Sequence, residues 1–469
     1  MTLFDRSESE PPGDLSIVGS DRSVPLVNGE TRRYVNLDFA ASTPPLTAVA
    51  AAVDAMLPWY SSVHRGAGFK SQLSTAAFEG ARDAIREFFN VGDDDAVVFT
   101  RNTTEAINLL ASCLPDRTEV LAFEIEHHAN LLPWRGRARY LPAPDTFDGI
   151  LSSLEVALER TVGQPLVAVT GASNVTGEIW PVAEITALAH RYNARVLLDA
   201  AQLAPHHPID MRDLGVDYLA MSGHKMYAPY GAGVLIGRPD WLSGSQPFLV
   251  GGGAVDFVTT SDVTWSALPD RQEAGSPNVA GAVALGASCR ELQRFGMARL
   301  AGEEAELAGY ARRRLDAIEG LVLYQLFAGS AVPRLAITTF NLDGVHHSLL
   351  AAILSAEYGI GVRNGCFCAH PYLQRLLACD ASGRERIRDE IASGHREHVP
   401  GAVRASLGIG STRDDIDALA DALKDIGAHG PRWQYRVWES TGEYLPDPDP
   451  RCWPDLPFRL ATPRRTSES

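Results

Sequence analysis

From about Asn90 onward, the sequence alternates short β-rich runs with amphipathic helical stretches. This alternation is the signature of parallel βαβ units. Four of the runs, 96–100, 119–123, 166–170 and 196–199, consist of consecutive apolar residues with a polar residue only at one end, instead of alternating in polarity. Continuous apolar runs are expected of strands that are buried on both faces of a sheet. The chain is therefore predicted to adopt an α/β fold with a mostly parallel sheet.

A second region is predicted to begin near Gly296. It opens on a long, charged amphipathic stretch, 297–321, and continues with a strand-like run, 335–340, and a further helical stretch. A mixture of this kind is typical of a smaller α+β domain. We therefore predict a large domain that covers residues 34–295 and a small C-terminal domain that covers residues 296–430.

The two ends of the chain differ in composition from the rest. Residues 1–33 and 431–469 are rich in Pro, Ser, Asp and Arg and show no periodicity. Segments of this composition are expected to be extended or flexible. The C-terminal tail also contains several Trp and Tyr residues, so part of it is expected to pack on the body of the protein.

The balance of acidic and basic residues indicates which classes of macromolecule the protein can bind. The chain has 42 Lys and Arg against 58 Asp and Glu, a net charge of −16, which argues against a nucleic acid or an anionic membrane as partner. No apolar run approaches the length of a membrane span, and the N-terminus lacks the pattern of a signal peptide. The predicted compartment is therefore the cytoplasm. The six cysteines are too few and too scattered for a disulfide framework.

Polar residues gather directly after the predicted strands. Ligands of such a sheet bind beyond the carboxyl ends of the strands, so these residues are expected to meet at one edge. They are Thr103, Thr104, His127, His128, Asn174, Asp199, Gln202, His224 and Lys225. The sequence thus predicts a binding site at that edge of the sheet.

A lysine stands out among these residues. The motif Ser222-Gly223-His224-Lys225 follows the apolar run 216–221, and small and apolar residues surround it. A charge in such surroundings is costly unless it has a function, although a lysine taken at random is a solvated surface charge. A lysine flanked by a hydroxyl and an imidazole can hold an aldehyde cofactor as a Schiff base.

The neighbouring residues fit pyridoxal 5'-phosphate as that cofactor. A carboxylate at Asp199 can pair with a protonated pyridine nitrogen, although a helix N-cap explains this residue equally well. The segment 101–106 runs from a strand into a helix and offers N–H groups and hydroxyls to a phosphate, but Thr followed by Glu is also a common helix start. Ser222 and His224 can add donors, and His127 has a flat ring that can stack on a pyridine.

Two cysteines, Cys366 and Cys368, lie one residue apart in a glycine-containing loop. Such a pair can supply a nucleophile, a redox couple or half of a metal site. No second Cys or His pair stands at the spacing of a zinc site, so no metal is predicted. A purely structural loop cysteine is the remaining alternative.

These motifs resemble the class V branch of the fold-type I pyridoxal phosphate enzymes, and most closely the cysteine desulfurases and selenocysteine lyases. The resemblance runs from about Asn36 to Leu423. It rests on NLDFAAS at 36–42, VHRG at 63–66, TRNTTEAIN at 100–108, EHHAN at 126–130, SNVTG at 173–177, DAAQ at 199–202, the SGHK motif, RQEAGSPN at 271–278 and RNGCFCAHP at 363–371. It implies a large domain with a seven-stranded, mostly parallel sheet and a smaller α+β domain that carries the cysteine loop.

The resemblance also implies roles for individual residues. Lys225 would form the Schiff base and move protons, and His127 would stack on the cofactor ring. Asp199 would pair with the pyridine nitrogen, and Gln202 would donate to the ring hydroxyl oxygen. The remaining cofactor-binding positions would be Thr103, Thr104, Asn174, Ser222 and His224, together with Ser276 from the other chain of a homodimer. The substrate carboxylate would be held by Asn174 and Arg404, since the planar fork of an arginine makes two parallel bonds to a carboxylate.

The reaction that the resemblance implies is the removal of sulfur from L-cysteine. Cys368 would attack the substrate sulfur, leaving a persulfide on Cys368 and L-alanine, with a protein as a candidate sulfur acceptor. A class V aminotransferase, an epimerase or another C–S or selenocysteine lyase would keep the same cofactor, and a non-catalytic sulfur carrier or scaffold is a further alternative. The segment from Cys368 to Arg404 is longer than in compact desulfurases. Its length fits a loop mobile enough to hand sulfur to a partner, or a homologue with other chemistry.

Overall fold

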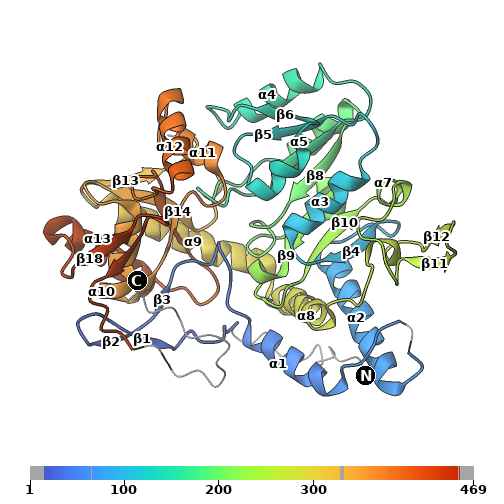
Figure 1. The fold of residues 1–469 in the computed structure, drawn as a ribbon, viewed down its shortest axis with the longest axis horizontal. Coiled ribbons are helices and arrows are strands. Elements are labelled where there is room, and N and C mark those ends of the chain that lie inside the picture. The colour runs from blue at the N-terminus through green and yellow to red at the C-terminus, as the bar shows by residue number, and fades with distance from the viewer. Residues whose placement is uncertain (1–14, 65, 328–331, 453, 455–469) are drawn as a thin grey trace.

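A seven-stranded sheet forms the centre of the larger lobe (Figure 1). The computed structural model describes residues 15–64, 66–327, 332–452 and 454. The strand order is β4-β10-β9-β8-β7-β5-β6. The strands are β4 (Ala96–Thr100), β5 (Val120–Phe123), β6 (Ala138–Leu141), β7 (Leu166–Thr170), β8 (Arg195–Asp199), β9 (Tyr218–Ser222) and β10 (Gly233–Gly237). All neighbours are parallel except β10, which pairs antiparallel with both β4 and β9.

Both faces of this sheet are buried, as the uninterrupted apolar runs predict. Successive residues of one strand enter two different apolar cores: Leu198 of β8 lies in one and Leu197 in the other. Helices cover the two faces, because each βα unit returns its chain across the sheet. They include α2 (Phe69–Phe88), α3 (Thr103–Cys113), α4 (Gly149–Leu158), α5 (Val182–Arg191) and α8 (Val279–Phe295). The predicted α/β fold class is confirmed.

A smaller α+β lobe follows Gly296. Its antiparallel sheet has the order β13-β14-β17-β16. The lobe comprises α9 (Met297–Asp316), β13 (Leu321–Tyr324), β14 (Ile337–Leu342), α10 (His347–Tyr358), β15 (Ile360–Gly361), β16 (Arg363–Gly365), β17 (Ala402–Ser406) and α13 (Arg413–His429). A short early strand, β3 (Val35–Asn36), pairs in parallel with β15, and Val35 and Leu37 belong to the apolar core of this lobe. The chain therefore contributes to the small lobe before it enters the large one.

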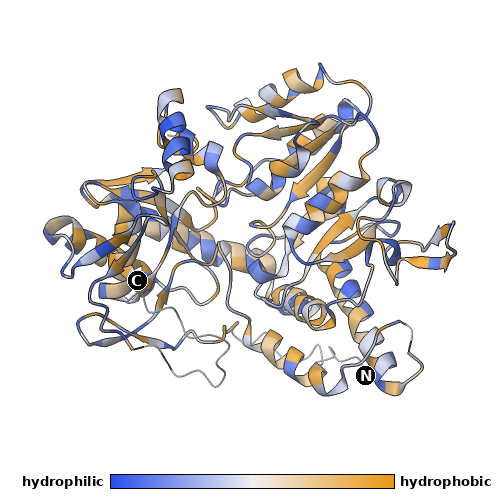
Figure 2. Ribbon diagram, viewed as in Figure 1, coloured by the Kyte–Doolittle hydropathy of each residue, from blue (hydrophilic) through white to orange (hydrophobic). Residues whose placement is uncertain are grey.

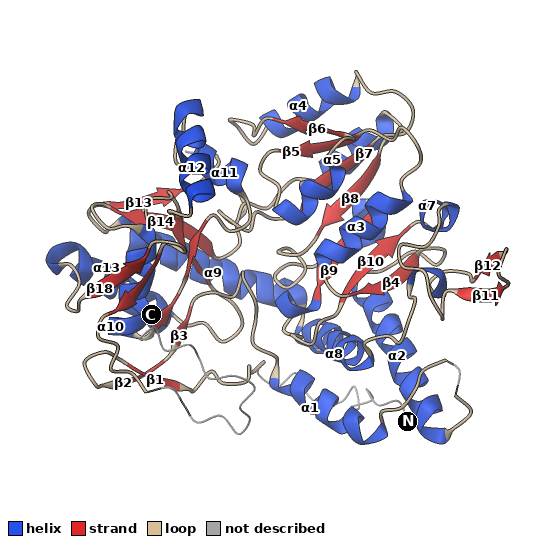
Figure 3. Cartoon of the chain, viewed as in Figure 1, coloured by secondary structure: helices blue, strands red, loops and turns tan. Residues whose placement is uncertain are grey.

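The remaining elements lie at the edges of the two lobes (Figure 3). They are β1 (Ser23–Pro25), β2 (Thr31–Arg33), α1 (Thr47–Met56), α6 (Met211–Leu214), α7 (Pro239–Gly244), β11 (Val255–Val258), β12 (Val263–Trp265), α11 (His370–Leu376), α12 (Ala381–Ser393), β18 (Tyr435–Trp438) and β19 (Glu443–Pro446). Within the C-terminal tail, β18 and β19 form a hairpin that packs against α10, where the Tyr435 hydroxyl donates to Glu357 at 3.0 Å. Figure 2 shows α12 as a hydrophilic helix, in keeping with its lack of buried residues.

No helix within the described ranges is both long enough and apolar enough to cross a membrane.

A buried ion pair joins the helices of the large lobe to its sheet. The Arg82 guanidinium of α2 makes two bonds to the Glu273 carboxylate, at 2.8 and 3.0 Å, and both side chains are 6% exposed. Glu273 also accepts the N–H of Phe99 in β4. Loss of Glu273 leaves the buried Arg82 guanidinium with the partly exposed Glu79 carboxylate as its remaining ion-pair partner among the described residues, so most of its compensation is lost.

The Glu273→Ala variant is expected to lower the free energy of unfolding by about 3–5 kcal/mol. Urea-induced unfolding followed by circular dichroism measures the change. The control Glu306→Ala removes an exposed carboxylate from α9 and is expected to change the value by less than about 0.5 kcal/mol. Equal effects of the two substitutions would contradict a structural role of the buried pair.

Candidate active site

A cavity of about 240 Å³ opens at the carboxyl ends of the central strands, where it meets the small lobe. Its lining includes Thr103, Thr104, His127, Asn174, Asp199, Gln202, Ser222, His224, Lys225, Cys368 and Arg404. Of the site residues predicted from the sequence, all except His128 and Ser276 therefore border one cavity. Ser276 instead lines a separate cavity with His64 and Gly275.

The Lys225 amine lies in this cavity, in the short 3₁₀ turn Gly223–Lys225 that follows β9. Burial lowers the pKa of the amine to about 8, and the Asp199 carboxylate partly offsets that shift. The positive charge of Arg404 lowers the pKa further, and Cys368 raises it. An amine whose pKa lies this close to neutrality can both accept and release a proton at physiological pH.

His127 is held as a neutral imidazole. Its Nδ1 accepts the N–H of Ala129 at 3.0 Å, so any proton on the neutral ring sits on Nε2. Burial, with smaller contributions from Lys225, His128 and Arg404, lowers the pKa of His127 to about 3. The ring is thus an uncharged flat surface on the cavity wall, which suits stacking on another ring.

Asp199 ends β8 and is 3% exposed. Its Oδ1 accepts the N–H of Ala201 at 3.0 Å, and the residues that follow form turns. The alternative of a helix N-cap is therefore wrong for this residue, because no helix begins here. Burial raises the pKa of the carboxyl, while the Ala201 N–H and the Lys225 charge lower it. Oδ2 makes no hydrogen bond within the described part of the chain, so it is available to a cationic ligand atom.

The opposite end of the cavity has the features of an anion site. The helix α3 begins at Thr103, whose N–H donates to Ser222 Oγ at 2.7 Å. Thr104 is exposed in the first turn, where backbone N–H groups carry partial positive charge. His224 is neutral at physiological pH, since burial and then Lys225 lower its pKa to about 4. This end can bind a phosphate group through hydroxyl and N–H donors.

Arg404 projects from the small lobe and is 3% exposed. It donates to the Asn174 carbonyl at 2.8 Å and to Asp38 Oδ1 at 3.2 Å. Its Nε is buried and has no hydrogen-bond partner within the described residues. The buried guanidinium of Arg404 thus has an unused N–H donor in the cavity that also holds the Lys225 amine. Such a group is suited to bind a carboxylate.

The cysteine loop is a tight turn tied to the cavity wall. The Ala369 N–H donates to the Cys366 carbonyl at 3.0 Å, and the two residues between them, Phe367 and Cys368, have φ of 53° and 55°. The Cys368 carbonyl accepts the N–H of His128 at 2.8 Å. The long segment beyond the turn contains α11 and α12. The position of Cys368 is thus set by hydrogen bonds on both sides of the turn.

Sequence reasoning missed three residues that shape this site. Asp38 pairs with Arg404, and Arg363 lines the cavity beside it. Glu126 lies beneath the wall and accepts from Asn130 and from the Thr170 N–H, while burial raises its pKa to about 8. Asp38 and Arg363 reach the cavity only because the small lobe packs against the large one. The order of the strands in the large sheet therefore does not predict that they belong to the site. Glu126 directly precedes His127, and its position in the motif was the available signal.

Comparison with known proteins identifies the family. Residues 35–419 match the aminotransferase class-V model. The chain belongs to the aminotransferase class-V family. A probable cysteine desulfurase of Halalkalibacterium halodurans is 37% identical over 410 residues, which cover 85% of this chain and 94% of the relative. A cysteine desulfurase of Klebsiella pneumoniae is 35% identical over 412 residues, again 85% of this chain and 94% of the relative.

Solved structures agree with the family assignment. The cysteine desulfurase CsdA from Escherichia coli superposes with a TM-score of 0.70 at 32% identity, over 83% of this chain and 94% of that one. A cysteine desulfurase from Thermococcus onnurineus gives a TM-score of 0.75 at 28% identity, over 89% of this chain and 99% of that one. The predicted fold-type I architecture and the class V resemblance are thereby confirmed.

Class-V enzymes use pyridoxal 5'-phosphate (PLP), and the cavity fits that group. The fit rests on polar atoms that the protein itself leaves without partners. Gln202 Nε2 donates to the Ala40 carbonyl at 2.7 Å, but its Oε1 is buried and lacks a partner among the described residues. The ring N–H and the ring hydroxyl of PLP are donors that Asp199 Oδ2 and Gln202 Oε1 can accept, and the Lys225 amine can react with its aldehyde.

Proposed function

We propose that this class-V enzyme removes the sulfur of L-cysteine and releases L-alanine, with Cys368 as the group that first accepts the sulfur. The observation that carries the proposal is the arrangement of a thiol, an amine and a buried guanidinium around a single cavity. Cys368, Lys225 and Arg404 all line it. The names of the relatives, which are cysteine desulfurases, support the same reaction.

In this proposal the residues that hold PLP are those described above. Lys225 would bind its aldehyde, Asp199 its ring nitrogen, Gln202 its hydroxyl oxygen and His127 its face. The phosphate would be bound by Thr103, Thr104, Ser222 and His224, and Asn174 would border the ring. When bound, PLP withdraws electrons from the α-carbon of an amino acid, which labilises the bonds around that carbon.

The chain's own residues would carry out the remaining steps. Arg404, and Asn174 beside it, would orient the substrate carboxylate. The Lys225 amine would take the α-proton and later return a proton to the product carbon. The Cys368 thiolate would attack the substrate sulfur, so that an S–S bond forms as the carbon–sulfur bond breaks. Alanine leaves, and Cys368 retains the sulfur as a persulfide.

Ser276 supports the proposal of a homodimer. It does not line the Lys225 cavity of its own chain and instead shares a cavity with His64 and Tyr60. Exposed apolar side chains, among them Trp59 and Phe69, flank residues 60–64 of this cavity in the chain between α1 and α2. An apolar surface of this kind is suited to a partner subunit, whose site Ser276 would complete. We place this dimer in the cytoplasm, where a reducing environment keeps the six cysteines as free thiols.

Single-turnover measurements with L-cysteine test the proposed function. The protein is reconstituted with PLP, mixed with one equivalent of L-cysteine without added thiol, and quenched. One alanine per active site, together with one sulfur atom bound to Cys368, is expected. Pyruvate and ammonia instead of alanine would indicate a lyase, and accumulation of the aminated form of the cofactor would indicate an aminotransferase. Either result would overturn the proposal.

A further inference from the structure

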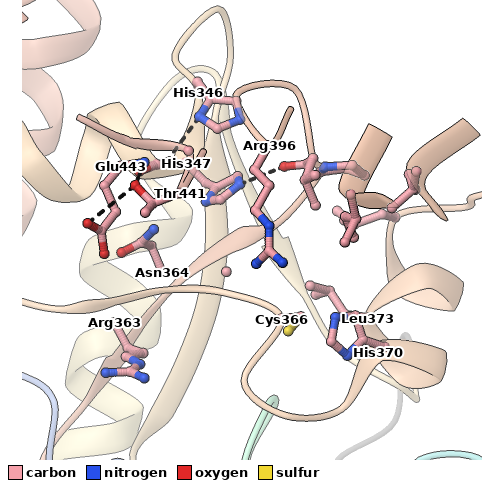
Figure 4. Close-up of a pocket in the computed structure, with 18 of the residues that line it drawn as sticks. His346, His347, Arg363, Asn364, Cys366, His370, Leu373, Arg396, Thr441 and Glu443 are labelled. Carbon is pink, nitrogen blue, oxygen red and sulfur yellow. Dashed lines mark hydrogen bonds between the residues drawn. The ribbon is translucent and has the colours of Figure 1, made fainter. Parts of the chain in front are cut away.

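A second cavity, of about 400 Å³, is bordered by Cys366 of the cysteine loop (Figure 4). Its walls come from β16, the start of α10, the α11–α12 segment and the turn between β18 and β19. The α11–α12 segment belongs to the long insertion after Cys368, and the β18–β19 turn belongs to the C-terminal tail. The proposed reaction assigns no role to either. Arg363 lines both cavities, so the two adjoin at this residue.

The two cysteines of the loop face different cavities. Cys366 lines the second cavity and Cys368 lines the cavity of Lys225. They are the first and third residues of the hydrogen-bonded turn that Ala369 closes. The two central residues of this turn, Phe367 and Cys368, have positive φ, an uncommon conformation for residues with a side chain. The conformation is held by packing and by hydrogen bonds: Phe367 is 7% exposed, and its carbonyl accepts from Asn174 at 2.8 Å.

The turn also keeps the backbone positions of the two cysteines near each other. The end residues of a β-turn lie within about 7 Å, and the first and third residues are closer along the chain. Cysteines whose Cα atoms are about 4.4–6.8 Å apart can be joined through sulfur. The backbone spacing of Cys366 and Cys368 is therefore compatible with the passage of a sulfur atom from one side chain to the other.

The second cavity contains groups suited to an anionic thiol. Among the described residues, the guanidinium groups of Arg363 and Arg396 take part in no hydrogen bond and no ion pair. Figure 4 shows the Arg396 side chain extending into the cavity on the side of Cys366. His346 Nε2 and His347 Nδ1 are buried and lack hydrogen-bond partners in the described part of the chain. The two carboxylates of the lining are Asp38, which is paired with Arg404, and Glu443.

A metal site does not explain this cluster. No three of the His, Cys, Asp and Glu side chains within the described ranges are arranged to hold one metal ion. Burial lowers the pKa of His346, His347 and His370, which favours the neutral form of these rings. A neutral imidazole can accept a hydrogen bond from a thiol or from a bound ligand.

We propose that Cys366 is a second sulfur carrier, which takes the sulfur from Cys368 and presents it in the second cavity to a thiol that bears a carboxylate. This inference rests on the proposed desulfurase function. In the step, the Cys366 thiolate attacks the terminal sulfur of the Cys368 persulfide. A new S–S bond forms on Cys366, the S–S bond on Cys368 breaks, and Cys368 leaves as a thiolate. The proton of Cys366 passes to a neighbouring base, and no oxidant or reductant is consumed.

The acceptor thiol then repeats the same exchange at Cys366. Its thiolate attacks the terminal sulfur, and Cys366 leaves as a thiolate. Arg396 and Arg363 would bind the carboxylate of the acceptor and align its thiol with Cys366. We call this transfer from Cys368 to Cys366 and on to the acceptor the relay. The relay separates the removal of sulfur from the amino acid from its delivery to the acceptor, because the acceptor never enters the cavity that holds the amino acid.

The location of the sulfur after one turnover tests the relay. The PLP-bound enzyme receives one equivalent of L-cysteine labelled with heavy sulfur, the thiols are alkylated, and fragmentation mass spectrometry assigns the label. We expect label on both Cys366 and Cys368 in the natural protein. In Cys366→Ser and Cys366→Ala it is expected on Cys368 alone. The control Cys379→Ser, which removes another thiol from the same cavity, is expected to show the natural distribution.

Sulfur transfer to mercaptosuccinate supplies a second readout. Transfer is expected to slow by roughly tenfold or more in both Cys366 variants. In Arg396→Gln, the KM for mercaptosuccinate is expected to rise several-fold while that for uncharged 2-mercaptoethanol stays unchanged. The control Arg388→Gln, an exposed residue of α12 that does not line the cavity, is expected to alter neither value.

The outcomes separate the relay from the proposed function. Label on Cys368 alone in the natural protein, with equal transfer rates in the Cys366 variants, would overturn the relay and leave the desulfurase intact. Absence of both alanine and labelled Cys368 in the natural protein would overturn the proposed function and the relay together. Label on both residues with no charge preference for the acceptor would refute the assignment of the second cavity to a carboxylate-bearing thiol.

Discussion

Replacement of Lys225 by alanine is expected to reduce the turnover of L-cysteine by roughly 10⁴-fold, because the substrate loses the group that moves its protons. It is also expected to abolish the covalent link to PLP. The pKa of the amine, about 8, lies close to neutrality, whereas the pKa values of His127 and His224 in the same cavity are lowered to about 3 and about 4. Stopped assays of alanine, and absorbance spectra after dialysis, measure the two effects.

The sequence offers an unusually clean control for this variant. The chain has only two other lysines, Lys70 and Lys424, and Lys424 is exposed at the end of α13. Lys424→Ala is expected to retain both turnover and cofactor absorbance. After borohydride reduction, the mass of the cofactor is expected on the peptide that contains Lys225. Reduction that labels Lys70 or Lys424, or a Lys225→Ala protein that keeps its colour and activity, would show that another residue holds PLP.

Much of the large lobe could be predicted because its strands carry a strong local signal. The runs that contain Val98, Leu121, Ala168 and Leu198 are apolar on both faces, and the structure buries all of them. Parallel strands bring their carboxyl ends to one edge, so the order of polar residues along the chain predicts which side chains share the cavity. For this reason the grouping of Asp199 with residues far away in sequence followed from the pattern alone.

The parts of the site that depend on packing between lobes could not be predicted. Asp38 reaches Arg404 only because the early strand β3 joins the small lobe, a pairing with no local signature. Likewise, the positive φ values of Phe367 and Cys368 arise in residues that rarely adopt them, so turn propensities do not indicate this turn. The length of the segment after Cys368 was compatible with a mobile loop. The structure instead contains the helices α11 and α12 there.

Substitution of Cys368 by serine is expected to lower the rate of alanine formation from L-cysteine by about 10³-fold, because a serine hydroxyl is a far weaker nucleophile toward sulfur than a thiolate. PLP binding is expected to survive, since Cys368 is exposed and contacts the rest of the cavity wall mainly through its carbonyl, which serine retains. Retained cofactor absorbance with lost turnover would therefore separate the chemical role of the thiol from a role in folding.

The matched control is Cys452→Ser, which removes another exposed thiol in the C-terminal tail, outside both cavities. It is expected to keep the natural rate. If Cys368→Ser kept that rate as well, the sulfur would have to leave without covalent capture by the enzyme, and a C–S lyase would describe the reaction better. The same result would remove the basis for a second carrier at Cys366, because no persulfide would form for it to attack. The reaction type and the use of the second cavity thus both depend on the thiol at position 368.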